Sequence, residues 1–550
     1  MVEPSAFRTH EVFNQPPPLE GYNLFSSDAA LIEAVRREGA DWALDDLTAY
    51  GEQLGTAETL QHGALANRDP PRLHAFDRFG RRIDWVEHHP AYHALMGMQV
   101  AQGIHASPWS EPKPGAHVHR AAGLYMSGQV EAGTSCPISM TYAAAPVLAQ
   151  AGASVRALLP KLYSRRYDPA HRPVAEKSGA LIGMGMTEKQ GGSDVRANTT
   201  RAAPLASGAP GEAYRIVGHK WFMSAPMCDA FLILAQAPGG LSCFFVPRWT
   251  PDGDLNALRF QRLKDKLGNR SNASAEVEFE GALGWLVGDE GRGVATILEM
   301  VGYTRLDNVL GSAGVQRQAL AQALHHARHR TAFQKRLVDQ PLMTNVLADL
   351  ALEVEAATAL AFRLARAFDA REDEPETLLR RLVTPAAKFW VCKRGPILAA
   401  EALEVLGGAG YIEDSGMPRL YRELPVYSIW EGSGNVVCLD VLRALQREPR
   451  CLEAVAAELA PLAGVDRRLD AQIEVVLSAP RQGLGEGDLR RYCRDLVVTV
   501  QAALLARHAP PIISDAFLAT RVGGERGAFG LLPAGLDLHG IVDRAGDGLT

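Results

Sequence analysis

The chain has 550 residues, 47% of them hydrophobic and 22% charged, and a formal net charge of −6. These proportions are ordinary for a globular protein, and the length allows several domains. The slight excess of acidic residues excludes a general attraction for nucleic acid, so any such binding depends on a local patch.

Cysteine usage and the N-terminal segment indicate the cellular compartment of the protein. Seven cysteines are scattered without CxxC spacing, which argues against a disulfide framework and against a zinc site. Residues 1–24 lack the apolar stretch and cleavage site of a signal peptide. No apolar run approaches the roughly 20 residues that a membrane helix needs. We therefore expect a cytoplasmic protein without a metal or a membrane anchor.

The hydrophobic pattern predicts an α+β protein with four regions. The N-terminal arm, which extends to Phe25, has no periodicity and suits packing on a neighbouring subunit, whereas residues 27–163 are predicted to be mostly helical. The predicted regions are an N-terminal arm and helical domain over 1–178, a β domain over 179–290, a helical bundle over 291–448 and an extra helical region over 449–550.

Short apolar or alternating runs bounded by glycines predict a small antiparallel β domain. These runs are 214–218, 230–234, 242–246 and 275–279. Longer helical patterns follow and fit a four-helix antiparallel bundle. The predicted helices are 294–336, 341–370, 376–406 and 435–447. The last region is predicted to be helical as far as Pro510-Pro511, and then rich in glycines that include Gly523, Gly524 and Gly527.

Two polar segments place small or hydroxyl residues beside a carboxylate: Met186–Asp194 and Trp430–Asn435. Gly191 and Gly192 let the first segment turn sharply and approach a ligand closely. The second segment leads into an apolar helical run, whose N-terminus would favour an anion. Taken alone, each segment is better explained as a polar loop and a helix cap.

A third segment, Gly218–Ala225, is a strand-like run that ends in aromatic residues and a hydroxyl. Trp221 or Phe222 could cover a flat ring while Ser224 hydrogen-bonds its edge. The alternative is the aromatic end of a hairpin.

These segments resemble motifs of the acyl-CoA dehydrogenases. The first is similar to their Thr-Glu-x-x-x-Gly-Ser-Asp loop, the third to their Gly-x-Lys-x-aromatic-x-Thr/Ser motif, and the second to their aromatic-Glu-Gly-Thr/Ser-x-Gln/Asn turn. Further matches are 265–270, 330–335 and 406–411. The similarity is greatest to the AidB-type branch, which belongs to the adaptive response to DNA alkylation, and it then covers nearly the whole chain.

The resemblance implies an N-terminal helical domain, a middle β domain, a C-terminal four-helix bundle and an extra helical region that binds DNA. It also implies FAD as the cofactor, and it implies a homo-oligomer, expected to be a tetramer, because Arg330 and Phe333 match positions that reach a neighbouring subunit's FAD. The implied cofactor-binding residues are Met184, Gly185, Met186, Thr187, Gln190, Gly191, Gly192, Ser193, Phe222, Met223, Ser224, Arg330, Phe333, Ile429, Trp430, Glu431, Gly432, Ser433, Gly434 and Asn435.

Glu431 matches the family's catalytic base, which takes the α-proton of an acyl thioester while a hydride leaves the β-carbon. Burial would raise the pKa of this carboxyl and a helix N-terminus would lower it, and the sequence leaves that balance open. The alternative is that Glu431 stabilises the first turn of the following helix. Glu404 and Gly302 stand where the family often has Gln and Asp, and both departures bear on binding of a CoA thioester.

Two further groups of residues have competing interpretations. His325, His326 and His329 share helical spacing without a joining carboxylate or cysteine, which favours a solvated helix face over a metal site.

The resemblance implies that the C-terminal region binds double-stranded DNA without sequence preference and protects or repairs it, with Arg443 and Arg521 at matched contact positions. Residues 451–550 nevertheless carry ten arginines, no lysine and thirteen acidic residues. The alternatives are a metabolic acyl-CoA dehydrogenase whose tail serves oligomerisation and a flavin-bearing protein without turnover.

Overall fold

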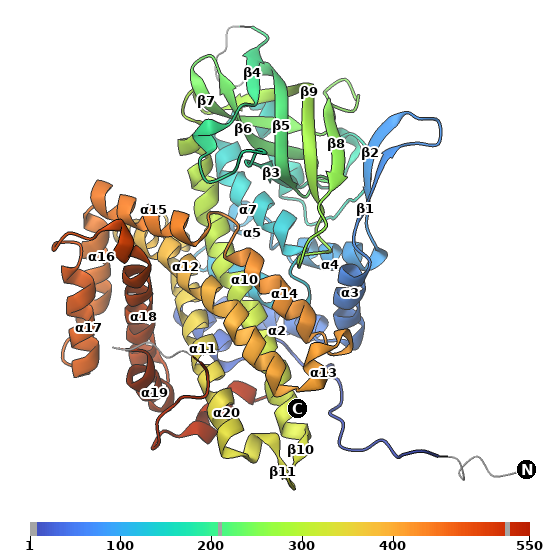
Figure 1. The fold of residues 1–550 in the computed structure, drawn as a ribbon. Coiled ribbons are helices and arrows are strands. Elements are labelled where there is room, and N and C mark those ends of the chain that lie inside the picture. The colour runs from blue at the N-terminus through green and yellow to red at the C-terminus, as the bar shows by residue number, and fades with distance from the viewer. Residues whose placement is uncertain (1–7, 207–211, 523–527, 550) are drawn as a thin grey trace, which may run out of the picture.

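Strands from the middle of the chain lie at one end of the molecule, and helices from both ends of the chain form the rest (Figure 1). The computed structural model describes residues 8–206, 212–522 and 528–549. None of the helices in these ranges is both long and apolar enough to cross a bilayer.

The N-terminal region is mostly helical, as predicted. Side-chain caps start its helices: the Asp28 carboxylate accepts from the Leu31 amide, and the Thr56 hydroxyl accepts from the Thr59 amide. The helices are α1 (Ala29–Arg37), α2 (Leu44–Leu54), α3 (Ala57–Arg68), α4 (Pro90–Ala101), α5 (Ser107–Ser110), α6 (Ala116–Val130), α7 (Ser135–Ala149), α8 (Ala153–Arg156) and α9 (Leu159–Leu162).

The helical prediction is wrong for one stretch of this region, where β1 (Arg72–Phe76) and β2 (Arg82–Glu87) form an antiparallel hairpin. Asp77 closes the turn, because its carboxylate accepts the amides of Phe79 and Arg81. Burial alternates from Asp84 to Glu87 along β2, which is the period of a strand rather than of a helix.

The β domain is one seven-stranded sheet in the order β3-β5-β4-β6-β7-β9-β8, with added β3–β6 and β5–β9 pairings that fold it back on itself. The four predicted strands lie within β5, β6, β7 and β9. The strands are β3 (Ile182–Gly185), β4 (Arg201–Pro204), β5 (Ala213–Ser224), β6 (Ala230–Ala237), β7 (Gly240–Pro247), β8 (Leu258–Leu263) and β9 (Ser274–Val287). The prediction of a purely antiparallel sheet is wrong, because β3 runs parallel to β6. The long connection between these two strands permits parallel pairing.

The C-terminal bundle is built around α10, which packs against α6 and α7 on one side and α11 and α12 on the other. The first predicted helix extends too far, because β10 (Thr331–Ala332) and β11 (Lys335–Arg336) form a tight hairpin with Phe333 and Gln334 at positive φ. The bundle helices are α10 (Gly293–His329), α11 (Pro341–Asp369), α12 (Glu374–Val405) and α15 (Gly434–Arg447), joined by the unpredicted α13 (Gly408–Tyr411) and α14 (Met417–Tyr427).

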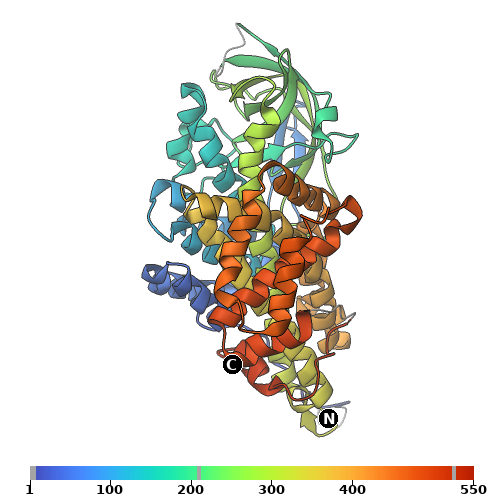
Figure 2. The same cartoon turned by 90° about the vertical axis from the view of Figure 1, so that its left-hand side faces the viewer.

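The last region lies along one side of the bundle (Figure 2). Its α18 packs against α11 and α12, and its α20 against α10 and α11. The prediction that the helical part ends at Pro510-Pro511 is wrong, because α19 begins at Pro511, a residue that suits the first turn of a helix. The helices are α16 (Arg450–Leu459), α17 (Arg467–Ser478), α18 (Leu489–His508), α19 (Pro511–Arg521) and α20 (Leu538–Gly546). Gly523, Gly524 and Gly527 lie outside the described residues.

The N-terminal arm packs on its own chain. Asn14 exchanges hydrogen bonds with Thr331, and Arg330 Nη1 donates to the Asn14 carbonyl at 2.6 Å. His325 is buried and its Nε2 lies 2.9 Å from the Pro17 carbonyl. The interpretation of His325 as part of a solvated helix face is therefore wrong.

Candidate active site

A cavity lies where α7, α10, the beginning of the sheet and the turn before α15 meet. It holds about 570 Å³ of space not filled by protein, including its mouth. Ser224, Trp430 and Glu431 line it, so two of the three predicted segments meet here, and Met184, two residues before the first segment, lines it as well. The other lining residues are Leu124, Ala132, Ser135, Cys136, Ser139, Met140, Thr304, Asp307, Asn308, Gly311 and Tyr427.

Strand pairing joins the third segment to β3, the strand that leads into the first segment. Met184 lies opposite Ser224, and Gly185 lies opposite Met223, in the β3–β5 pair. Met223 is fully buried, so its side chain belongs to the core, whereas Phe222 is 46% exposed. The end of β5 therefore presents one aromatic side chain and one hydroxyl beside the Met184 backbone.

A buried ion pair, which the sequence did not reveal, fastens the loop after β3. Lys220 Nζ lies 2.8 Å from Glu188 Oε1, and both side chains are fully buried. Although burial acts to raise it, the pKa of Glu188 is held well below its usual range by Lys220. Burial, in contrast, lowers the pKa of Lys220 to about 8 against the attraction of Glu188. Glu188 and Lys220 both belong to the sequence segments described above. A strand with only a structural role would not need a charged residue at either position.

The loop itself is folded around the Glu188 carboxylate, which also accepts the Thr199 amide at 2.7 Å. Gln190 Nε2 donates to the same carboxylate at 2.8 Å, so that side chain has a structural role. Gly191 has φ 131° and open space where a Cβ would stand, whereas a Cβ on Gly192 would lie 2.2 Å from the Thr187 hydroxyl. Gly191 and Gly192 are therefore the two positions of the loop tip that suit only glycine. The tip is exposed as far as Ser193, and the open space beside Gly191 leaves room for a ligand.

The turn that carries Glu431 is held in a strained conformation. Glu431 has φ 56°, which is uncommon for a residue with a side chain. Arg305 Nε donates to the Glu431 carbonyl at 3.0 Å, and Lys388 Nζ donates to the Gly432 carbonyl. Arg305 is in turn fixed by Asp440 at 2.5 Å. Such strain persists only where the surroundings impose it, and these cations do so.

Burial raises the pKa of the Glu431 carboxyl, with opposition from the Thr304 hydroxyl and from Arg305 and Lys388. The balance that the sequence left open is thus decided in favour of burial. The carboxyl belongs to the cavity lining, and no acidic residue lies in the first turn of α15. This geometry suits a base better than a residue that stabilises the helix.

The start of α15 fits a ligand with an anionic part and a flat part. Its N-cap, Ser433, makes no side-chain capping bond, so the first-turn amides of Gly434 and Asn435 are not satisfied in that way. Ile429 is 64% exposed next to the half-buried Trp430. Exposed apolar side chains beside an uncapped helix N-terminus match an aromatic ring system that carries phosphate.

Arg330 and Phe333 are not brought to this cavity within one chain. They belong to the β10–β11 hairpin and its approach, at the opposite end of the molecule from the sheet (Figure 1). Phe333 is 93% exposed.

The two arginines predicted to contact DNA differ in their surroundings. Arg443 is exposed on α15. Arg521 is largely buried, with Nη2 at 2.5 Å from Asp349 and Nε at 3.3 Å from Glu353. Because both acidic partners engage its guanidinium, Arg521 does not present a free charge to a phosphate.

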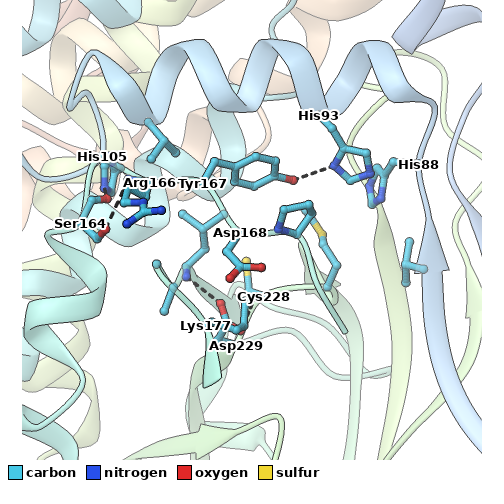
Figure 3. Close-up of a pocket in the computed structure, with 17 residues that line it drawn as sticks. His88, His93, His105, Ser164, Arg166, Tyr167, Asp168, Lys177, Cys228 and Asp229 are labelled. Atoms are coloured by element: carbon cyan, nitrogen blue, oxygen red, sulfur yellow. Dashed lines mark hydrogen bonds and ion pairs between the residues drawn. The ribbon is translucent and has the colours of Figure 1, made fainter. Parts of the chain in front are cut away.

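A second cavity, with about 520 Å³ of unfilled space, lies between the end of β2, α4 and residues 164–181 (Figure 3). His93 Nδ1 lies 2.9 Å from the Tyr167 hydroxyl on one side, and Lys177 pairs with Asp229 at 2.7 Å on the other. No group of three metal-ligating side chains occurs in the described ranges. None of the predicted site residues lines this cavity.

The histidines of this second cavity predict a loss of stability in acid. Burial lowers the pKa of His88 to about 3, that of His105 to about 4, and that of His93 as well. Each therefore binds a proton on unfolding, so the free energy of unfolding falls as pH drops below about 6.5. We expect His88 and His105 together to cost about 4 kcal/mol between about pH 7.5 and pH 5. Urea titrations across this range measure it.

The control for this prediction replaces an exposed residue that does not titrate. Ser110→Ala should leave the pH dependence unchanged, whereas His88→Gln should make it shallower. An unfolding free energy that is level across the range would contradict the buried, neutral state of these imidazoles.

Three family models match the chain in order. They describe the adaptive response protein AidB N-terminal domain over residues 14–169, the acyl-CoA dehydrogenase middle domain over 183–282 and the acyl-CoA dehydrogenase C-terminal domain over 291–446. The chain is 52% identical over 516 residues to the AidB protein of Escherichia coli (strain K12), covering 93% of this chain and 94% of that one.

Two solved structures are similar over most of their length. The ACDH-11 protein of Caenorhabditis elegans, in complex with C11-CoA, superimposes with a TM-score of 0.83 at 27% identity, covering 100% of this chain and 95% of that one. The apo-form of Bd2924 gives a TM-score of 0.82 at 30% identity and covers 91% of this chain and 100% of that one.

Proposed function

Because the chain belongs to the acyl-CoA dehydrogenase family, in its AidB-type branch, we propose that it is an FAD-dependent flavoprotein that desaturates an acyl thioester. FAD, when bound, supplies an acceptor for the hydride of the β-carbon. The observation that carries the proposal is Glu431, whose carboxyl lines a cavity together with Ser224 and Met184 and has a raised pKa.

The residues present fit FAD. The glycine-rich loop after β3, the exposed Phe222 with Ser224 at the end of β5, and the uncapped start of α15 offer a close backbone approach, a ring contact and an anion site. Arg330 and the exposed Phe333 would complete the site of a neighbouring subunit, which supports a homo-oligomer and, by resemblance, a tetramer.

The chain's own residues prepare the proton transfer. Glu431 accepts the α-proton, and burial raises its pKa so that it holds the proton at the carboxylate instead of releasing it at once. Arg305 and Lys388 fix the backbone on either side of the base. Anaerobic mixing of the FAD-loaded protein with a panel of acyl-CoA esters tests this, because turnover bleaches the flavin.

A second function, binding of double-stranded DNA without sequence preference, is supported by arginines on α15 and α18. Arg443 and Arg447 lie one turn apart on α15, and Arg490 lies at the start of α18, which packs against α15. All three are exposed and none has an ion-pair partner within the described ranges. By resemblance to AidB, we propose that this binding protects or repairs DNA under alkylation stress.

Replacing Arg443 and Arg447 together with Ala is expected to weaken binding of labelled duplexes about equally for every sequence. The dependence of affinity on salt, measured by anisotropy between about 50 and 200 mM, should become shallower by about one unit for each phosphate that the variant no longer neutralises. Arg36→Ala, an exposed arginine on α1, is the control. If the unaltered protein binds no duplex even at low salt, the tail serves only assembly and the chain is a metabolic dehydrogenase.

A further inference from the structure

One wall of the active-site cavity is polar. Ser135 and Ser139 from α7, and Asp307 and Asn308 from α10, line it together. The Asp307 carboxylate is almost fully buried, and the Ser139 hydroxyl donates to it. A pocket for an aliphatic chain has no need of a buried carboxylate and three further polar side chains.

The Asp307 charge is fixed in place and neutralised. Both terminal nitrogens of Arg120 bind this carboxylate, with Nη2 at 2.7 Å from Oδ2. Arg120 Nε donates to the Ile104 carbonyl at 2.8 Å, and its guanidinium lies 3.7 Å from the centre of the Tyr142 ring. This ion pair, stacked on the Tyr142 ring, holds the Asp307 carboxylate at the cavity wall.

Two polar atoms of the same wall are unsatisfied. Ser135 Oγ and Asn308 Nδ2 are buried and have no hydrogen-bond partner among the residues that the structure describes. Water can satisfy both atoms as long as the cavity holds no organic ligand. An alkyl chain would displace that water and leave both atoms unpaired, whereas a ligand with its own polar group would replace it.

We propose that the acyl group accepted here carries a hydroxyl group that binds Asn308 and Ser135; this rests on the proposed dehydrogenase function. A hydroxyl both donates and accepts, so it satisfies the Asn308 amide in either orientation. An acidic acyl group is disfavoured, because the lining side chains include two carboxylates, Asp307 and Glu431, and no cation.

Binding is tested with two CoA thioethers of equal length, S-(4-hydroxybutyl)-CoA and S-pentyl-CoA, titrated calorimetrically into the FAD-loaded protein. Neither has a thioester carbonyl, so the readout is independent of turnover. We expect the hydroxylated ligand to bind about tenfold more tightly, as one recovered hydrogen bond allows. Asn308→Leu should remove or reverse the preference and Ser135→Ala should reduce it, while Ser110→Ala, exposed and outside the cavity, should preserve it.

A parallel measurement separates this inference from the function on which it rests. Flavin bleaching is compared for 4-hydroxybutyryl-CoA and valeryl-CoA. A preference for the hydroxylated thioether without bleaching by either ester supports the polar pocket and contradicts the dehydrogenase function. Bleaching by both esters with equal thioether affinities, or no binding of either thioether, overturns the inference. If Asn308→Leu does not fold, Ser135→Ala carries the comparison.

Discussion

Replacing Glu431 with Gln is expected to slow the bleaching of bound flavin by acyl thioesters about 10²–10⁴-fold, the usual contribution of a positioned general base. The amide keeps the shape of the side chain but cannot take the α-proton. FAD content and thermal stability should change little, because Arg305 and Lys388 hold this turn through backbone carbonyls that the substitution leaves in place. Anaerobic stopped-flow absorbance measures the rate.

The pH dependence of the unaltered protein gives an independent check. The base works only when ionised, and burial raises the pKa of Glu431. The rate should therefore fall with acid at a pH above that of an ordinary glutamate, and this limb should vanish in Glu431→Gln. Glu372→Gln, an exposed position just before α12, is the matched control. A Glu431→Gln protein that bleaches at the unaltered rate would remove this carboxylate from the mechanism.

Replacing Lys220 with Met is expected to lower the free energy of unfolding by about 3–5 kcal/mol, the range for removing one partner of a buried ion pair. Glu188 would be left as an uncompensated buried charge at the centre of the loop after β3. The same loop is proposed to hold FAD, so the variant should also purify with less flavin. Urea unfolding and the visible absorbance of the purified protein measure the two effects.

Two comparisons separate the ion pair from general damage to the sheet. Lys189→Met changes the neighbouring lysine, which is exposed and lies 3.9 Å from Glu278, and should have little effect. The double variant Glu188→Gln with Lys220→Met should recover part of the stability, because the uncompensated charge is gone. A Lys220→Met protein as stable as the unaltered one would show that the pair contributes nothing net.

The sequence predicts the parts of the site that depend on residue type. Gly191, Ser224 and Glu431 stand out because glycine, hydroxyl and carboxylate groups have recognisable roles in loops, strand ends and turns. It does not predict what depends on long-range pairing. Arg521 resembles a surface cation until its acidic partners, 168 and 172 residues away in the chain, are seen beside it.

The same limit applies to the cavity wall and to the fold. Asp307 meets Arg120 across 187 residues, so neither residue alone marks a polar pocket. The β1–β2 hairpin is not predicted because its strands are only five and six residues long. A pattern that short is weak evidence for a strand when longer helical patterns flank it. The parallel β3–β6 pair is also not predicted, because it depends on the order of the strands in the sheet and not on the residues of either strand alone.

The ion pairs of Arg544 have a consequence for how the protein is made. This residue of α20 binds Glu33 of α1 across 511 residues, and it also binds Glu355 of α11. During synthesis the N-terminal helices emerge first and would begin to pack. The two Arg544 ion pairs nevertheless form only after nearly the whole chain has been synthesised, whereas α1 packs against α11 and α6 without them. A chain that ends before α20 therefore lacks the cation that joins Glu33 of α1 to Glu355 of α11.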